Sequence, residues 1–214
     1  MKIKLLPSTV VALALFSGAS HATLITTNSM TVTDDFSNYT SGWNFTSGPI
    51  TLNSGAVWST TYGSSVIGNS SYGLAGNGSW NSARNGYTGL NTNIGSMTFL
   101  LPQEVNYVGG FINYATSNYA DVIMEALDIY GNVLESYNIN QLAAISTPNT
   151  TNQGAFRGIS RTTFDISSLR VSNGYVVLDD LTFGDAKVSD VPVPATLWLV
   201  GLGITLLGFS KRKV

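Results

Sequence analysis

Short runs of alternating apolar and polar residues, separated by Gly, Asn and Ser, fill the middle of the chain. A period of two places successive side chains on opposite faces of a β-strand, whereas helical patterns repeat about every 3.6 residues. The alternation predicts strands at 24–36, 97–101, 105–114, 155–159, 162–171 and 175–183. Many short strands without a strong helical pattern favour an all-β fold, and we expect a single β-sandwich of the jelly-roll type.

A hairpin between residues 121 and 140 is the clearest single unit of this pattern. Two β-rich runs flank Gly131-Asn132 there. A glycine readily adopts the positive φ of a tight turn, so the spacing predicts a two-residue hairpin turn. Ile123, Leu127 and Ile129 lie on one face of the first strand, but Glu125 shares that face, which leaves the identity of the buried face open.

The N-terminal segment differs from the body. Lys2 and Lys4 precede an apolar stretch at 10–16, and small residues follow at positions 20 and 22. This arrangement predicts a signal peptide at 1–22 that is cleaved after Ala22. A membrane anchor is disfavoured because the apolar stretch is too short to span a bilayer. Residues 23–188 would then form the extracytoplasmic domain.

The segment 189–214 also stands apart from the body. An apolar run of 15 residues at 195–209 would make a helix of roughly 22 Å, at ~1.5 Å per residue, against a hydrocarbon core of ~30 Å. We expect a marginal transmembrane helix rather than a buried core helix. A basic stop follows the run, and by the positive-inside rule it would stay in the cytoplasm while the body faces outward. The stop consists of Lys211, Arg212 and Lys213.

The order of a proline motif, a glycine-punctuated apolar run and a basic stop resembles the PEP-CTERM protein-sorting domain of Gram-negative bacteria, in the variant written VPLPA. The motif residues are Val191, Pro192, Val193, Pro194 and Ala195. The resemblance implies processing by an exosortase, a membrane enzyme that cuts near the prolines and passes its substrate to the cell surface or extracellular matrix. Val193 stands where the commonest form of the motif has Glu, so if the processing enzyme reads that carboxylate, the resemblance implies a variant enzyme or a retained anchor.

Composition and charge exclude several function classes. The chain has no Cys, and its one histidine, His21, lies in the predicted signal peptide. The mature chain would therefore lack Ser-His-Asp and Cys-His catalysis and imidazole-ligated metal sites. Residues 23–190 hold twelve acidic and five basic side chains, a formal net charge of −7. Such a body repels phosphate backbones, which disfavours nucleic-acid binding.

A Gly-, Ser- and Asn-rich stretch at 54–93 carries several large aromatic residues, among them Trp58, Trp80 and Tyr87. Flat aromatic rings can cover the apolar faces of sugars while neighbouring amides and hydroxyls bind the sugar hydroxyls. These three residues are therefore candidate glycan contacts. The alternative is that they are core anchors, because a glycine-rich stretch needs large side chains to become ordered.

Carboxylates are the remaining candidates for chemistry. Asp34 and Asp35 lie near the first predicted strand, and Asp179 and Asp180 lie near the last. If these strands pair, the four carboxylates are a candidate structural calcium site, since calcium takes six to eight oxygen ligands. The alternative assigns them to strand ends and turns.

A hydrolase would use a pair of carboxylates in one cleft, and Glu125 and Glu135 are the pair that the predicted hairpin could bring together. A solvated face is the other interpretation of these two glutamates. We expect a non-catalytic, exported protein that is anchored in the inner membrane facing the periplasm and then passes to the cell surface or outside. Its role would be structural or adhesive in the envelope or exopolysaccharide matrix, with a carbohydrate-binding module as the alternative.

Overall fold

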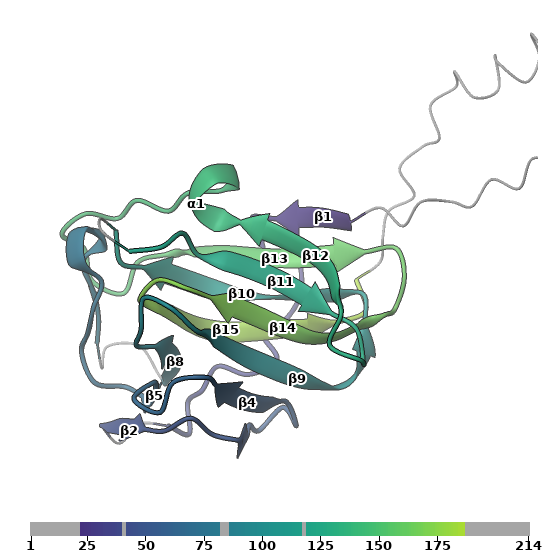
Figure 1. Cartoon of the computed structure of the whole chain (residues 1–214), viewed down its shortest axis with the longest axis horizontal. Helices are drawn as coiled ribbons and strands as arrows, with labels where there is room; N and C mark the ends of the chain where they lie inside the picture. The colour runs from purple at the N-terminus through teal and green to yellow at the C-terminus, as the bar shows by residue number, and fades with distance from the viewer. Residues whose placement is uncertain (1–21, 40–41, 82–85, 117–118, 187–214) are drawn as a thin grey trace, which may run out of the picture.

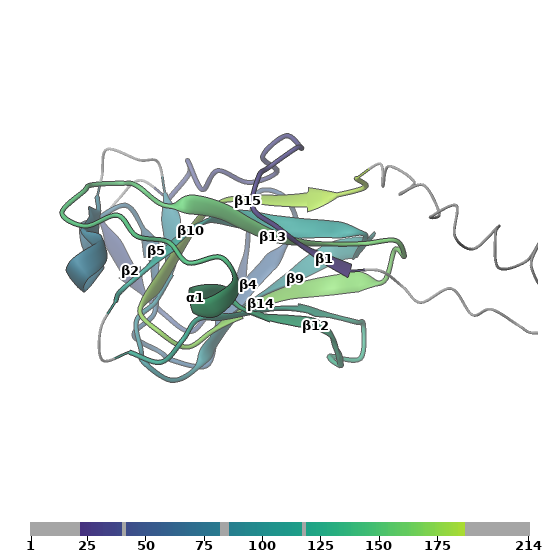
Figure 2. The same cartoon turned by 90° about the horizontal axis from the view of Figure 1, so that it is seen from above.

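Two antiparallel sheets stack face to face in the computed structural model, which describes residues 22–39, 42–81, 86–116 and 119–186 (Figures 1 and 2). The all-β fold with stacked sheets is confirmed. The predicted signal peptide and the predicted transmembrane tail lie outside the described residues. Within the described ranges, no helix has the length and apolar character needed to cross a bilayer.

The first sheet has seven strands. Their spatial order is β1 (Ala22–Ile25), β13 (Ala155–Arg161), β10 (Tyr107–Tyr114), β15 (Val176–Gly184), β8 (Tyr87–Leu90), β5 (Val66–Gly68) and β2 (Trp43–Phe45). The second sheet has six strands, in the order β12 (Val133–Asn138), β11 (Ile123–Leu127), β14 (Ile166–Ser172), β9 (Ser96–Val105), β4 (Val57–Thr60) and β3 (Ile50–Thr51). A small hairpin of β6 (Tyr72–Gly73) and β7 (Ser79–Trp80), the 3₁₀ turn η1 (Ala75–Asn77) and the one-turn helix α1 (Ile139–Leu142) complete the fold.

The main core fills the space between the two sheets. Alternate residues of β9 point into it, and Met97 and Phe99 are fully buried there. The opposite sheet contributes the buried side chains of Ile112 and Leu178. Each large apolar side chain buried in this way stabilises the fold by about 1.5–3 kcal/mol relative to an exposed position. Burial of one face of each strand in this core therefore explains the alternation of apolar and polar residues in the longer predicted strands.

A second hydrophobic cluster lies on the outer face of the seven-stranded sheet. The β6–β7 hairpin covers this face and contributes Tyr72, Leu74 and Trp80. The sheet supplies Val66, Tyr87 and Val177. The glycine-rich stretch thus becomes ordered by folding over the sheet.

The strands predicted from residue 97 onward correspond to β9, β10, β13, β14 and β15. The strand predicted at 24–36 is wrong beyond Ile25. The Asn28 carboxamide accepts hydrogen bonds from the backbone N–H of Met30, at 2.9 Å, and from the hydroxyl of Tyr107, at 3.1 Å. These contacts bend the chain away from the sheet, and it returns only at the isolated bridge between Asp34 and Leu181.

The hairpin of β11 and β12 is confirmed, but its predicted two-residue turn is wrong. The connection runs from Asp128 to Asn132. The Asp128 carboxylate accepts hydrogen bonds from the backbone N–H groups of Tyr130 and Asn132, which holds the wider loop, while Gly131 takes the expected positive φ of 82°. The buried face of β11 carries Met124 and Ala126. Ile123 and Glu125 therefore lie on the opposite, partly exposed face.

Candidate functional site

The three aromatic residues predicted as glycan contacts are all fully buried. Trp58 lies in the core between the sheets, whereas Trp80 and Tyr87 belong to the outer cluster. A ring enclosed on both sides has no free face for a sugar. The prediction for Trp58, Trp80 and Tyr87 is therefore wrong in this structure, and the alternative interpretation as core anchors fits their burial.

Exposed aromatic rings lie instead on the edge strand β2. Trp43 is 44% exposed and Phe45 is 50% exposed. Residues two apart in a strand project from the same face. Their ring centroids are 5.0 Å apart at an interplanar angle of 84°, an edge-to-face arrangement. The two rings form one apolar surface, which we call the β2 aromatic pair.

Close backbone packing supports the β2 aromatic pair from below. Trp43 pairs with Gly68 of β5, and Gly68 pairs in turn with Tyr87 of β8. A Cβ atom on Gly68 would lie 2.0 Å from the carbonyl oxygen of Gly42, so only glycine fits between these strands. The Tyr87 hydroxyl donates a hydrogen bond to the Ser70 carbonyl. These contacts fix the position of β2 and therefore of Trp43.

Further aromatic rings pack beside Tyr87 and on neighbouring segments. Tyr72 and Tyr87 make an edge contact with centroids 5.9 Å apart, and the Tyr72 hydroxyl donates to the Leu90 carbonyl at 2.8 Å. Burial raises the pKa of both phenols well above the usual value, so both stay neutral. The half-buried Tyr175 packs against Tyr119 with centroids 4.9 Å apart.

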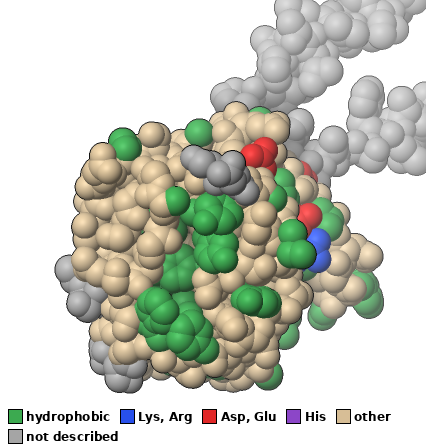
Figure 3. Space-filling model, turned by 60° about the vertical axis from the view of Figure 1, so that its left-hand side comes forward, with side chains coloured by type: hydrophobic (Ala, Val, Ile, Leu, Met, Phe, Trp, Pro, Cys, Tyr) green, Lys and Arg blue, Asp and Glu red, His purple; other side chains and the backbone are tan. Residues whose placement is uncertain are grey.

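Figure 3 turns the β2 end of the molecule toward the viewer. Hydrophobic side chains gather near the middle of this face, and charged side chains appear only toward one edge. The Asn69 side chain lies near β2, where its carboxamide accepts a hydrogen bond from the backbone N–H of Gly42. The face combines apolar rings with neutral polar groups.

The segments that carry the predicted calcium ligands do meet. Asp34 forms a bridge with Leu181, next to Asp180. The Asp34 carboxylate is buried, however, and accepts hydrogen bonds from the backbone N–H groups of Phe36 and Ser54. Asp179 is also buried, and its carboxylate accepts a bond from the N–H of Asp180 at 2.7 Å. These carboxylates hold local backbone turns.

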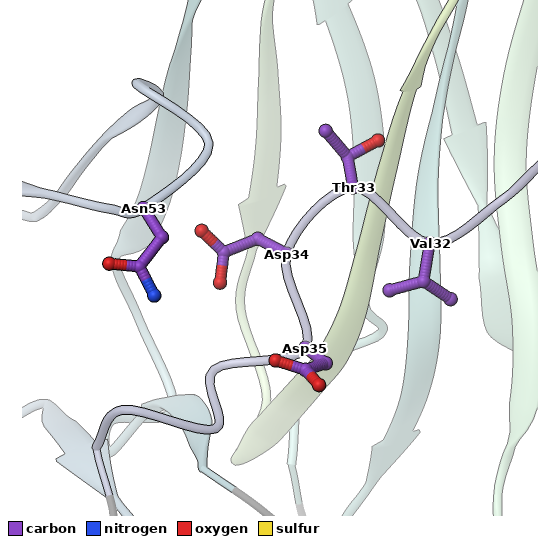
Figure 4. Close-up of a pocket in the computed structure, with 5 residues that line it drawn as sticks. All are labelled: Val32, Thr33, Asp34, Asp35 and Asn53. Atoms are coloured by element: carbon purple, nitrogen blue, oxygen red, sulfur yellow. The ribbon is translucent and has the colours of Figure 1, made fainter.

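A shallow hollow of about 280 Å³ lies beside Asp34 (Figure 4). Its lining consists of Val32, Thr33, Asp34, Asp35 and Asn53. Hydrogen bonds from Ser37 hold the pKa of Asp35 below its usual value. In the described part of the chain, no three acidic, His or Cys side chains converge as metal ligands do. The expected four-carboxylate cluster is not assembled, and calcium binding stays a prediction.

The proposed hydrolase pair is not assembled either. Ser136 stands opposite Glu125, whereas Glu135 stands opposite Ala126. Neighbouring positions of a strand face opposite sides of the sheet, so the two glutamates cannot share a cleft. Each has an arginine partner: Glu125 accepts from Arg170 Nε at 2.6 Å, and Glu135 forms an ion pair with Arg161.

The described fold ends close to the predicted sorting tail. The Asn106 side chain donates to the Ala186 carbonyl at 3.0 Å and accepts from the Ala186 N–H at 2.8 Å. A family model described as the PEP-CTERM protein-sorting motif matches residues 190–213. The chain carries a PEP-CTERM sorting motif. Only three residues separate Ala186 from the matched region.

The PEP-CTERM match indicates an exported protein that undergoes membrane-associated sorting by exosortase-like machinery. It includes the predicted motif residues 191–195 and the basic stop 211–213, all of which lie outside the described residues. Comparison with curated proteins and with solved structures gave no significant match.

Sequence reasoning missed the β2 aromatic pair, although a signal for it exists. Trp43 and Phe45 are separated by one polar residue in a short run between glycines. That alternation is the pattern of a strand with one apolar face. The alternate positions are Gly42, Asn44 and Thr46, none of which has a large apolar side chain. The pattern itself therefore indicates that the two rings share one face of the strand.

Proposed function

We propose that the chain is a non-catalytic surface protein whose jelly-roll-like sandwich binds neutral polysaccharide of the envelope or exopolysaccharide matrix. The observation that carries this proposal is the exposed edge-to-face pair of Trp43 and Phe45 on an exported, sorted chain. The proposal joins the structural or adhesive role to carbohydrate binding and assigns both to β2.

The chemistry of the surface supports a neutral glycan. A sugar ring has an apolar face of C–H groups and a rim of hydroxyls. Aromatic rings cover the apolar face and remove it from water, while an amide side chain such as that of Asn69 can hydrogen-bond the rim. Charged side chains lie toward one edge of this face, so nothing in its centre selects an anionic sugar (Figure 3).

The small size of the surface supports weak binding by each copy. Two rings remove little area from water, and association costs several kcal/mol in lost freedom, so we expect a Kd on the order of 0.1–1 mM. Many copies on one cell surface or in one matrix would add their contacts through multivalency. Weak, repeated contacts suit an adhesive role.

Native gel electrophoresis of the full chain in mild detergent, through gels that contain dissolved neutral glucan, mannan or galactan, tests the proposal. At least one polysaccharide should retard the protein, and Trp43→Ala and Phe45→Ala should each abolish most of the retardation. Leu100→Ala, which removes an exposed apolar side chain from β9, is the matched control. Retardation that survives both aromatic substitutions, or that no polysaccharide produces, would overturn the proposal. Circular dichroism confirms that each variant is folded.

A further inference from the structure

Both ends of the described fold leave from one end of the sandwich. Ala22, the first residue of β1, pairs with Arg161 at the last position of β13. Gly184, the last residue of β15, pairs with Tyr107, the first of β10. Figures 1 and 2 show β1 starting and β15 ending at this same end. We call it the tether end.

Two loops at the tether end carry large apolar side chains that point into solvent. The β11–β12 loop presents Ile129, which is 67% exposed, and Tyr130, which is 87% exposed. The connection between β13 and β14 presents Phe164, which is 54% exposed. β13 ends and β14 begins beside Asn106, whose side chain hydrogen-bonds the backbone of Ala186. The register therefore places the β13–β14 connection at the tether end.

The register also fixes the β11–β12 loop at this end. Leu127, the last residue of β11, pairs with Ser168 of β14, two positions from Ile166, and Ile166 pairs with Val105. Val105 directly precedes Asn106. Figure 2 shows the tip of β12 projecting at the same end as the start of β1.

Internal hydrogen bonds hold both loops in shape. The Asp128 carboxylate accepts the N–H groups of Tyr130 and Asn132, at 2.9 and 2.8 Å, and the Asn132 side chain at 2.9 Å. Arg161 donates to Asp165 from Nε at 2.8 Å, next to Phe164. The acidic groups are thus engaged within the loops, and the apolar side chains are the parts that project.

The geometry points to the tether end as a membrane-docking surface, on which Ile129, Tyr130 and Phe164 enter the interface of the bilayer that holds the sorting tail. Residues 187–194 separate Ala186 from the apolar run at 195–209, a reach of at most about 32 Å at ~3.5 Å per residue. A tail held in a membrane therefore keeps this end, and not the opposite one, nearest the lipid. Tyrosine and other aromatic residues are enriched at membrane interfaces, where an apolar body meets a polar rim.

Docking on this end would also orient the molecule. β8 pairs with the first half of β15, at Val176–Leu178. β5 then pairs with β8, and β2 pairs with β5. The exit at Gly184–Ala186 lies beyond the other half of β15. The β2 aromatic pair would then lie away from the bilayer, toward the other end of the sandwich.

Site-directed spin labelling tests this inference, and the absence of Cys from the chain makes each introduced label unique. The full chain carrying Tyr130→Cys or Phe164→Cys is labelled with a nitroxide in vesicles of phosphatidylethanolamine and phosphatidylglycerol. Collision rates with oxygen and with a water-soluble nickel chelate report the depth of the label. The control is Ile94→Cys, an exposed apolar residue in the turn between β8 and β9 at the opposite end.

We expect the ratio of oxygen to nickel collisions to be at least threefold higher at Tyr130 and Phe164 than at Ile94. The addition of Ile129→Asp should lower the ratio at Tyr130 toward the control value. Equal ratios at the two ends would overturn the inference. A high ratio that disappears when the lipid-to-protein ratio is raised tenfold would also overturn it, because contact between copies depends on protein density whereas contact with lipid does not.

Discussion

Replacement of Asn77 by alanine should destabilise the domain strongly, because this side chain joins three segments inside the fold. Asn77 is buried, and its Nδ2 group donates to the carbonyls of Tyr114 and Ile145, at 2.9 and 3.0 Å, and to Asn113 Oδ1 at 3.2 Å. Its Oδ1 accepts from the N–H of Thr147 at 3.0 Å. The network ties the β6–β7 hairpin to β10 and to the loop after α1.

The magnitude follows from the bonds that alanine cannot make. Two hydrogens on Nδ2 serve three acceptors, so the four contacts amount to about three full hydrogen bonds. At about 1 kcal/mol each, and with a further penalty for buried partners that are left unsatisfied, we expect a loss of roughly 3–5 kcal/mol. Asn44 is the matched control, since it is also followed by X-Ser/Thr but is exposed. Asn44→Ala should stay within about 0.5 kcal/mol of the parent.

Urea unfolding monitored by tryptophan fluorescence measures both variants, and equal slopes with urea concentration would show that only stability has changed. Trp80 also reports on the hairpin, because it packs against Phe111 of β10 with ring centroids 5.7 Å apart. A loss below about 1 kcal/mol for Asn77→Ala would refute the reasoning, since it would mean that water replaces the carboxamide at little cost.

Three further predictions concern acid stability, the β2 edge and processing. Burial opposes ionisation of Asp165, but hydrogen bonds from Arg161 and Thr163 outweigh it and lower the pKa of Asp165 below 3.8. The ionised carboxylate therefore stabilises the fold fully above about pH 4, and this stabilisation is lost as the pH falls further. In urea unfolding at a series of pH values, Asp165→Asn should reduce the loss of stability on the acid side. Gly68→Ala should displace β2 from β5 and remove polysaccharide retardation as fully as Trp43→Ala does; unchanged retardation would show that the close approach to Gly42 is dispensable. Intact mass should show that the mature chain starts at Thr23 and that the released form ends near residues 191–195, whereas a released form that extends to Val214 would indicate no cleavage at the motif.

The long strands were predictable because their alternation is dictated by burial on one face. Met97, Phe99 and Leu101 stand at every second position of β9, and each faces the core. The short strands between 43 and 90 were not predictable in the same way. They have only two to four residues each, and three of them contain a glycine, so their place in a sheet depends on partners that are distant in sequence.

The aromatic residues show why the site was harder to predict than the fold. Sequence gives the number of rings in the glycine-rich stretch but not which of them are covered. Tyr72 is enclosed because Gly89 leaves room beside it, where a Cβ atom would lie 3.1 Å from the Tyr72 ring. The charge partners of Glu125 and Glu135 are distant arginines that only the strand register brings near.

The attachment of the tail to β15 has a mechanical consequence. β15 is paired on both sides, with β10 and β8, and it lies three strands from β2 in the same sheet. A pull between a bound polysaccharide and the anchored tail would run along β15 and across the ladders to β8, β5 and β2, so that it loads the three residue pairs of each ladder together instead of opening them one by one. Tension on a cell attached through such contacts would therefore act along the direction in which the sheet resists force best. The weak contact with the sugar should then break before the domain unfolds.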